Sequence, residues 1–188
     1  MAPGLPGGAA MSSAVQGGRT AEAEALRGAA RQWSTGVALV TVQDGEELFA
    51  KTVSSFCVLS LEPPLVSVAI DRRSPLVRAA RGSGSYAVSI LNSRQEQVAR
   101  RFATPGAGRA LGPFTGVPMR AAESGAPVLE HCLAWFDCRL DGVLPGGDHA
   151  VLVGRVLSAD PGGGEPLLYH DGGYRLLDHS PHAPTGAP

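Results

Sequence analysis

The stretch that decides the fold is Ala50-Lys51-Thr52-Val53-Ser54-Ser55-Phe56, which ends an apolar, strand-like run. It leads into Leu61-Glu62-Pro63-Pro64-Leu65-Val66-Ser67-Val68, where a diproline precedes a second apolar run. Proline donates no backbone N–H and biases the residue before it to extended geometry. The pattern therefore predicts a strand, a rigid connector at residues 62–64 and a further strand over residues 65–70.

Three hydroxyls, those of Thr52, Ser54 and Ser55, fall within four residues where the first strand ends. Clustered hydroxyls with free backbone N–H groups can bind a phosphate as neutral donors. The simpler interpretation is that these side chains are the polar, outward residues of a half-buried strand. From this stretch alone both interpretations stay open.

Turn and strand signals continue along the chain. Asp44-Gly45 separates apolar runs at 36–43 and 46–55, which is typical of a β-hairpin. Further strands are expected at residues 85–91, 132–143, 148–159 and 174–177. Repeated strands with turn signals between them favour a mainly β fold, built as a closed or partly open antiparallel barrel.

The helices are expected to be few and short. The first starts at Thr20 and ends near Ser34, with Leu26, Ala29, Ala30 and Trp33 on one apolar face. Ser74-Pro75 predicts a helix over 75–81, because proline suits the first helical position. Ser93-x-x-Glu96 resembles a capping box opening a helix to about residue 102. Residues 104–127 show little periodicity and are predicted to be a long loop.

Composition excludes several classes of function. The 188 residues carry a net charge of −1, so no basic field favours nucleic acid or an anionic membrane. No apolar run approaches the length of a membrane span, and residues 1–18 lack the pattern of a secretory signal. We expect a mobile tail over 1–19, one domain over 20–177 and a mobile tail over 178–188.

The cysteines and the missing motifs narrow the chemistry further. An odd count of three Cys favours reduced thiols and a cytoplasmic location, and Cys132 and Cys138 are too far apart on an extended strand to bridge. No metal-ligand spacing occurs, so no metal is expected. Gly82-Ser83-Gly84 precedes a strand rather than a helix, which excludes a Rossmann dinucleotide motif, and no G-x-S-x-G elbow indicates a hydrolase.

Six segments resemble the flavin reductase-like family in the expected order, over about residues 30–177. These segments are Thr35–Thr41, the Ala50–Val68 stretch, Asp71-Arg72-Arg73-Ser74, Ala87–Leu91 with Gln95-Glu96, Gly147-Asp148-His149, and Pro166–Tyr169 with Gly173-Tyr174. The resemblance implies a split β-barrel that forms homodimers with a pocket shared between protomers. It also implies FMN or FAD as cofactor, NADH or NADPH as hydride source, and a possible partner flavin-dependent monooxygenase.

The resemblance also implies a set of site residues. His149 is placed at the nicotinamide, as a positioning residue for hydride transfer. Cofactor binding is expected from Thr52, Val53, Ser54, Ser55, Asp71, Arg72, Arg73, Ser74, Ser89, Gln95, Tyr169 and Tyr174. An arginine can hold phosphate through a bidentate fork, although the sequence leaves open whether Arg72 or Arg73 does so. Trp33 and Trp135 are expected in the core rather than against the flavin.

Two positions depart from the family pattern. The family usually has glycine at Ala50, where a methyl group would restrict close approach of a ligand to the backbone, and it commonly has asparagine at Ser89. The leading expectation is an NAD(P)H-dependent flavin reductase. The alternatives are a flavoprotein of the same fold that keeps its flavin and acts on an organic substrate, and a non-catalytic flavin- or haem-binding module.

Overall fold

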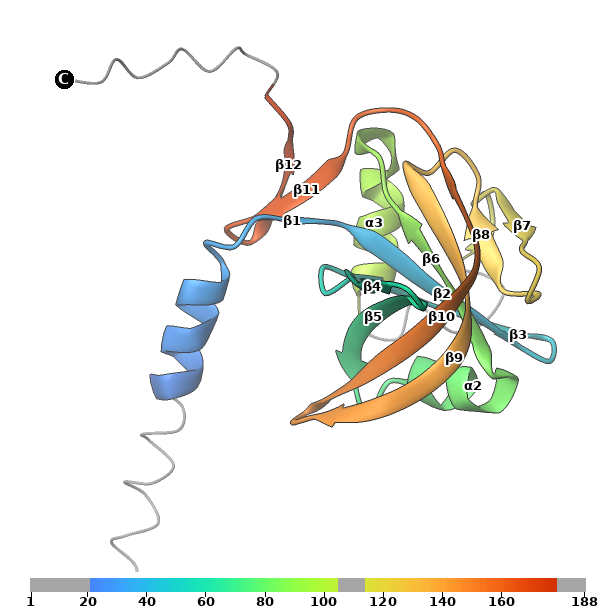
Figure 1. Ribbon diagram of the computed structural model, residues 1–188. Helices are drawn as coiled ribbons and strands as arrows, with labels where there is room; N and C mark the ends of the chain where they lie inside the picture. The colour runs from blue at the N-terminus through green and yellow to red at the C-terminus, as the bar shows by residue number, and fades with distance from the viewer. Residues whose placement is uncertain (1–20, 105–113, 179–188) are drawn as a thin grey trace, which may run out of the picture.

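The computed structural model describes residues 21–104 and 114–178 (Figure 1). Most of both predicted tails, residues 1–19 and 179–188, therefore lies outside the described part. The strands are β1 (Thr35–Gly36), β2 (Ala38–Asp44), β3 (Glu47–Val53), β4 (Cys57–Leu61), β5 (Pro64–Asp71), β6 (Ser85–Ile90), β7 (Met119–Ala121), β8 (Pro127–Leu129), β9 (Ala134–Gly146), β10 (His149–Pro161), β11 (Leu167–His170) and β12 (Gly173–Leu176). The helices are residues 21–30, α2 (Pro75–Ser83), the short η1 (Ser93–Gln95) and α3 (Glu96–Ala103).

One antiparallel sheet forms the body, in the order β3-β2-β6-β9-β10-β5-β4. The sheet curls so that the end of β3 approaches β5, where the Ser55 hydroxyl donates to the Ala69 carbonyl at 2.9 Å and accepts from the Ala69 N–H at 3.0 Å. A partly open barrel results. The predicted mainly β, split-barrel fold is confirmed.

β2 is apolar on both faces because each face packs against a different layer. Ala38, Val40 and Val42 point into the barrel core, which α2 closes at one end with Leu76 and its neighbours. Leu39, on the alternate face, packs with Phe102 of α3 in a second core. Period-two alternation thus places α2 and α3 against two different cores.

The predicted hairpin at Asp44-Gly45 is present, with Asp44 opposite Glu47 and Gly45 in the left-handed region at φ 59°. α2 begins at Pro75 as expected and extends two residues beyond 81, because the left-handed Gly84 (φ 71°) rather than Gly82 ends it. The capping box lies one residue earlier than predicted. The Asn92 side chain accepts from the backbone N–H of Arg94 at 3.0 Å and Gln95 accepts from that of Asn92 at 3.1 Å.

The prediction of a loop over 104–127 is wrong for its described second half. β7 and β8 form a hairpin there, with Met119 opposite Leu129. The hairpin is anchored by Asp137 of β9, a fully buried carboxylate that accepts from the Ser124 backbone N–H at 2.8 Å and from its hydroxyl. This anchor is a long-range contact, and local periodicity does not predict it.

A small three-stranded sheet, β1-β11-β12, and the helix of residues 21–30 extend from the body (Figure 1). The Asp171 backbone N–H donates to the Arg31 carbonyl at 2.9 Å, so the helix end is fixed to the β11–β12 turn. The apolar face of this helix is not buried in the single chain: Leu26 is 71 % exposed and Trp33 76 % exposed. The prediction that Trp33 lies in the core is therefore wrong for the monomer.

Candidate functional site

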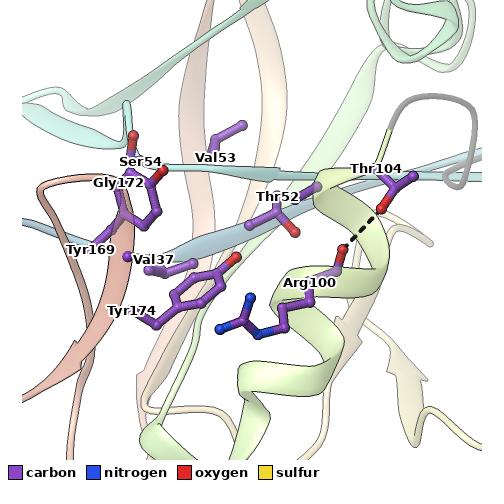
Figure 2. Close-up of a pocket in the computed structure, with 11 residues that line it drawn as sticks. Val37, Thr52, Val53, Ser54, Arg100, Thr104, Tyr169, Gly172 and Tyr174 are labelled. Atoms are coloured by element: carbon purple, nitrogen blue, oxygen red, sulfur yellow. Dashed lines mark hydrogen bonds between the residues drawn. The ribbon is translucent and has the colours of Figure 1, made fainter. Parts of the chain in front are cut away.

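A cavity of about 580 Å³ opens where three segments far apart in the sequence meet: the end of β3, the last turn of α3 and the β11–β12 hairpin (Figure 2). We call it the tyrosine cavity. Its lining residues are Val37, Thr52, Val53, Ser54, Arg100, Ala103, Thr104, Tyr169, Gly172, Gly173 and Tyr174. Five of the residues predicted from the sequence are thus brought together: Thr52, Val53, Ser54, Tyr169 and Tyr174.

The three clustered hydroxyls have three different roles. Thr52 donates to the Ala99 carbonyl of α3 at 2.8 Å, and Ser55 is bonded to Ala69 of β5. Ser54 is exposed, and no described residue bonds its hydroxyl. Ser54 alone has a hydroxyl available to a ligand, while its neighbours fix the strand end that carries it.

Tyr169 and Tyr174 form the aromatic wall of the cavity. They are opposite each other in the β11–β12 ladder, and their rings meet edge to face with centroids 5.6 Å apart. Partial burial raises the pKa of Tyr174, although the nearby Arg100 opposes this effect. The Tyr174 phenol therefore stays protonated at neutral pH and can donate a hydrogen bond. Paired aromatic rings also offer faces and edges to a planar ligand.

A second group of predicted residues lies outside the cavity, where β5 ends and β10 begins; we call it the His149 end. It comprises Asp71, Arg72, Arg73 and Ser74, with His149 at the start of the facing strand and Asp148 in the turn before it. Ser55 connects the two regions, because its partner Ala69 precedes Asp71 by two residues, or about 7 Å of extended strand.

The structure distinguishes the two arginines. Arg73 is committed to Asp71, with Nε 3.1 Å from one carboxylate oxygen and Nη2 2.9 Å from the other. That side-chain pairing holds the pKa of Asp71 well below its usual range. Arg72 is exposed. Its backbone N–H donates to the Asp148 carbonyl at 3.1 Å, and no described residue bonds its guanidinium. Arg72 is therefore the cation of the pair with a guanidinium available to an anion.

Ser74 is the residue before α2. Its extended backbone (φ −61°, ψ 131°) and the following Pro75 suit an N-cap, but its side chain makes no capping hydrogen bond. No described residue bonds the Ser74 hydroxyl, which remains available to an anion at the positive end of the helix dipole. The backbone offers less, because Pro75 has no N–H and the Val77 N–H donates to the Ser74 carbonyl at 3.1 Å.

His149 begins β10, opposite Asp71, with its side chain about half exposed. Its Nδ1 lies 2.7 Å from the Asp148 carboxylate. An ionised carboxylate only accepts, so the proton is on Nδ1 and Nε2 faces outward. The hydrogen bond from His149 lowers the pKa of Asp148, which keeps this orientation in place at neutral pH.

Ser89 and Gln95 do not join either region. Ser89 is fully buried and accepts from the Leu129 backbone N–H at 3.0 Å. Gln95 donates to the Glu130 carbonyl at 3.1 Å and lines a separate depression of about 1190 Å³. Ala50, the other departure from the family pattern, is 3 % exposed and packs in the core beneath α3. In this single chain both departures therefore face the core rather than the tyrosine cavity.

Sequence reasoning missed Arg100 and Thr104. Arg100 lies 4.9 Å over the Tyr174 ring, and Thr104 donates to the Arg100 carbonyl at 3.3 Å (Figure 2). The only signal in the sequence was helical spacing, because Glu96 and Arg100 are four residues apart and form an ion pair.

Across residues 21–104 and 114–178, no three His, Cys, Asp or Glu side chains gather as metal ligands, and no helix is long and apolar enough to cross a membrane.

Comparison with known proteins identifies the family of this chain. The model of the flavin reductase like domain matches residues 30–178. The reductase component of 4-hydroxyphenylacetate 3-monooxygenase from Thermus thermophilus is 39 % identical over 155 residues, which cover 82 % of this chain and 96 % of that protein. The chain therefore belongs to the flavin reductase-like family, as predicted.

Solved structures agree in fold. The flavin reductase component of a bacterial two-component tryptophan halogenase superposes with a TM-score of 0.78 at 34 % identity, covering 84 % of this chain and 99 % of that one. An NADH:FAD oxidoreductase of Streptomyces globisporus, solved with NAD and FAD fragments, gives 0.76 at 31 % identity, covering 84 % and 93 %.

Proposed function

We propose that this chain is an NAD(P)H-dependent flavin reductase that supplies reduced FMN or FAD to a partner monooxygenase. The observation that carries the proposal is the tyrosine cavity, whose volume lies in the range of small-molecule sites and whose wall combines two aromatic rings, free hydroxyls and a cation. The residues fit a flavin, because a planar ring needs stacking faces and a phosphate needs donors. The relatives named above support the same activity.

The cofactors supply the redox chemistry, in which a hydride leaves the nicotinamide and the flavin accepts it. The protein positions the two cofactors relative to each other. Ser54 and the tyrosines border the ring region, while Arg72 and Ser74 offer donors to a phosphate at the His149 end. Holding two planar rings in contact is the main catalytic device available to such a site.

His149 would orient the nicotinamide. With Nδ1 bonded to Asp148, its outward Nε2 accepts a hydrogen bond when the ring is neutral and donates one when it is protonated. A carboxamide, which both donates and accepts, can pair with either form. The Asp148 contact fixes the ring plane, so the imidazole needs little ordering when a ligand binds.

We further propose a two-fold homodimer in the cytoplasm. In one protomer the His149 end does not line the tyrosine cavity, and in the proposed dimer a second copy brings its own His149 end against it. Exposed apolar side chains support this assembly: Val58, Leu59 and Leu61 on the edge strand β4, and Leu26 and Trp33 near the chain's first helix. Light scattering at micromolar concentration tests the dimer, and a fully active monomer would exclude it.

The free cysteines support the proposed cytoplasmic location, because that compartment is reducing.

Steady-state oxidation of NADH and NADPH, each with FMN, FAD or no flavin, tests the activity. The expected result is rapid oxidation only when flavin is added, with one nucleotide preferred. Oxidation that needs no added flavin, by protein purified yellow, would favour the flavoprotein that retains its cofactor. Flavin binding without oxidation of either nucleotide would favour the non-catalytic module.

A further inference from the structure

Arg100 is the one charged side chain among the described residues that line the tyrosine cavity. It projects from the last turn of α3 toward Tyr174, as Figure 2 shows. The guanidinium is held on two sides. Its central carbon Cζ lies 4.9 Å from the centroid of the Tyr174 ring, and Nε and Nη2 lie 2.8 Å and 2.7 Å from the same oxygen of Glu96.

This geometry leaves a defined set of donors. A guanidinium has five N–H groups, and a single oxygen facing Nε and Nη2 occupies one on each. Both N–H groups of Nη1 and the outer N–H of Nη2 remain, and no acceptor in the described part of the chain pairs with them. These are the groups of the bidentate fork that fits two oxygens of a phosphate.

The C-terminal turn of a helix presents carbonyl oxygens that would repel an anion. Here three side chains each donate to one carbonyl near the end of α3. Thr52 donates to Ala99 at 2.8 Å, Thr104 to Arg100 at 3.3 Å and Lys51 to Ala103 at 3.1 Å. Lys51 also adds a positive charge, so the two cations Arg100 and Lys51 outnumber the one carboxylate, Glu96, beside the cavity.

The geometry points to Arg100 as a phosphate-binding residue of the tyrosine cavity, held ready by Glu96 and Tyr174. The inference rests on the proposed function, which requires two phosphate-bearing ligands, a flavin nucleotide and a nicotinamide dinucleotide. One chain offers two separate places for phosphate: this one, and the Arg72–Ser74 turn at the His149 end. Each ligand can then bind its phosphate apart from the other while their rings meet.

Calorimetric titration with oxidised ligands tests this without any turnover. The ligands are FMN, riboflavin, which has the same ring but no phosphate, NAD⁺ and NADP⁺. The variants are Arg100→Gln, Arg100→Lys, which keeps charge but loses the fork, and Arg78→Gln as a control. Arg78 is an exposed arginine of α2 that does not line the cavity. Thermal melts confirm that each variant is folded.

Arg100→Gln is expected to raise the Kd of at least one phosphate-bearing ligand by roughly 10- to 100-fold, since it removes charge-assisted hydrogen bonds. Arg100→Lys should lose less, Arg78→Gln should bind like wild type, and riboflavin affinity should be unchanged. Weaker FMN binding would identify the flavin phosphate. Weaker NAD⁺ or NADP⁺ binding, with a reduced salt dependence, would identify the dinucleotide.

Unchanged Kd values for all ligands would overturn the inference. Riboflavin binding weakened as much as FMN binding would also overturn it, because Arg100 would then act on the ring through Tyr174. A wild-type protein that oxidises neither nucleotide would contradict the proposed function alone. The titrations use no reduced ligand, so they still decide the role of Arg100.

Discussion

Thr52 of the edge strand β3 donates a 2.8 Å hydrogen bond to the Ala99 carbonyl of α3. Both partners are close to the tyrosine cavity, and the bond joins two of its three walls. A hydroxyl in a cluster that suggested phosphate binding therefore has a structural partner. This relationship predicts different effects for neighbouring hydroxyls that look equivalent in the sequence.

Thr52→Val should lower the free energy of unfolding by about 1 kcal/mol, because it leaves the Ala99 carbonyl without its donor at nearly constant side-chain volume. Chemical denaturation measures the change. Ser54→Ala is the matched control and should alter stability little, since no described residue bonds its hydroxyl. Equal losses in both variants would contradict the distinction.

Gly154→Ala should destabilise the barrel by roughly 1–3 kcal/mol through overpacking. A Cβ at Gly154 would touch the hydroxyl and ring of Tyr86 and come within 2.8 Å of the Cys138 Cβ. Gly142→Ala, in the paired strand, is the control, because a Cβ there meets nothing within 4 Å. Similar melting temperatures for both variants would contradict the prediction.

Tyr86→Phe should leave stability unchanged or raise it slightly, and should relieve part of the cost of Gly154→Ala. The Tyr86 hydroxyl is fully buried and no hydrogen-bond partner reaches it in the described structure. Burial also raises the pKa of this phenol, so it stays neutral. Removing an unpaired buried hydroxyl removes a desolvation cost. A double-mutant cycle of positions 86 and 154 measures the coupling.

At pH 8, thiol labelling of the native protein should modify Cys57 and leave Cys132 and Cys138 largely unmodified. Cys57 is exposed, whereas burial raises the pKa of Cys132 and raises that of Cys138 to about 12. The reactive species is the thiolate, which buried thiols do not form at this pH. Mass spectrometry should find one label on the native chain and three after denaturation. Rapid triple labelling of folded protein would disprove this.

His149→Ala should lower kcat/KM by roughly 10- to 100-fold, which corresponds to ~1.4–2.7 kcal/mol of transition-state stabilisation. The melting temperature should barely move, because the half-exposed side chain bonds only the exposed Asp148 among the described residues. Anaerobic stopped-flow measurement of flavin bleaching, beside a thermal melt, separates the two effects. Full activity would make His149 a polar surface residue, and a collapsed melt would make it structural.

The sequence predicted the elements whose signals are local. The Asp44-Gly45 turn, the Pro75 helix start and the apolar run at 36–43 each depend on a few adjacent residues, and the structure shows all three. β4 was missed because it is a short edge strand whose apolar side chains stay exposed, so no alternation marks it. The β7–β8 hairpin was missed because its anchor, Asp137, follows Ser124 by 13 residues.

The residues of the candidate site also divide into those that sequence motifs predicted and those whose position depends on contacts distant in the sequence. Thr52, Ser54, Tyr169 and Tyr174 were predicted from motifs, and they meet in one cavity. Ser89 also belongs to a motif, but a strand residue presents its side chain to only one face, and the motif does not say which. Arg100 could not be found, because a surface arginine on a helix has no distinctive neighbours until Tyr174, 74 residues later, folds beneath it.

The β11–β12 hairpin has a practical consequence for protein engineering. Tyr174, which lines the cavity, is four residues before Asp178, where the described structure ends, so a tag or a fused oxygenase joined after Asp178 would begin within about 14 Å of Tyr174. The opposite attachment point lies beyond the helix of residues 21–30, whose ten residues span roughly 15 Å. Fusions that channel reduced flavin should therefore use the C-terminal joint for proximity, and purification tags belong at the N-terminal one.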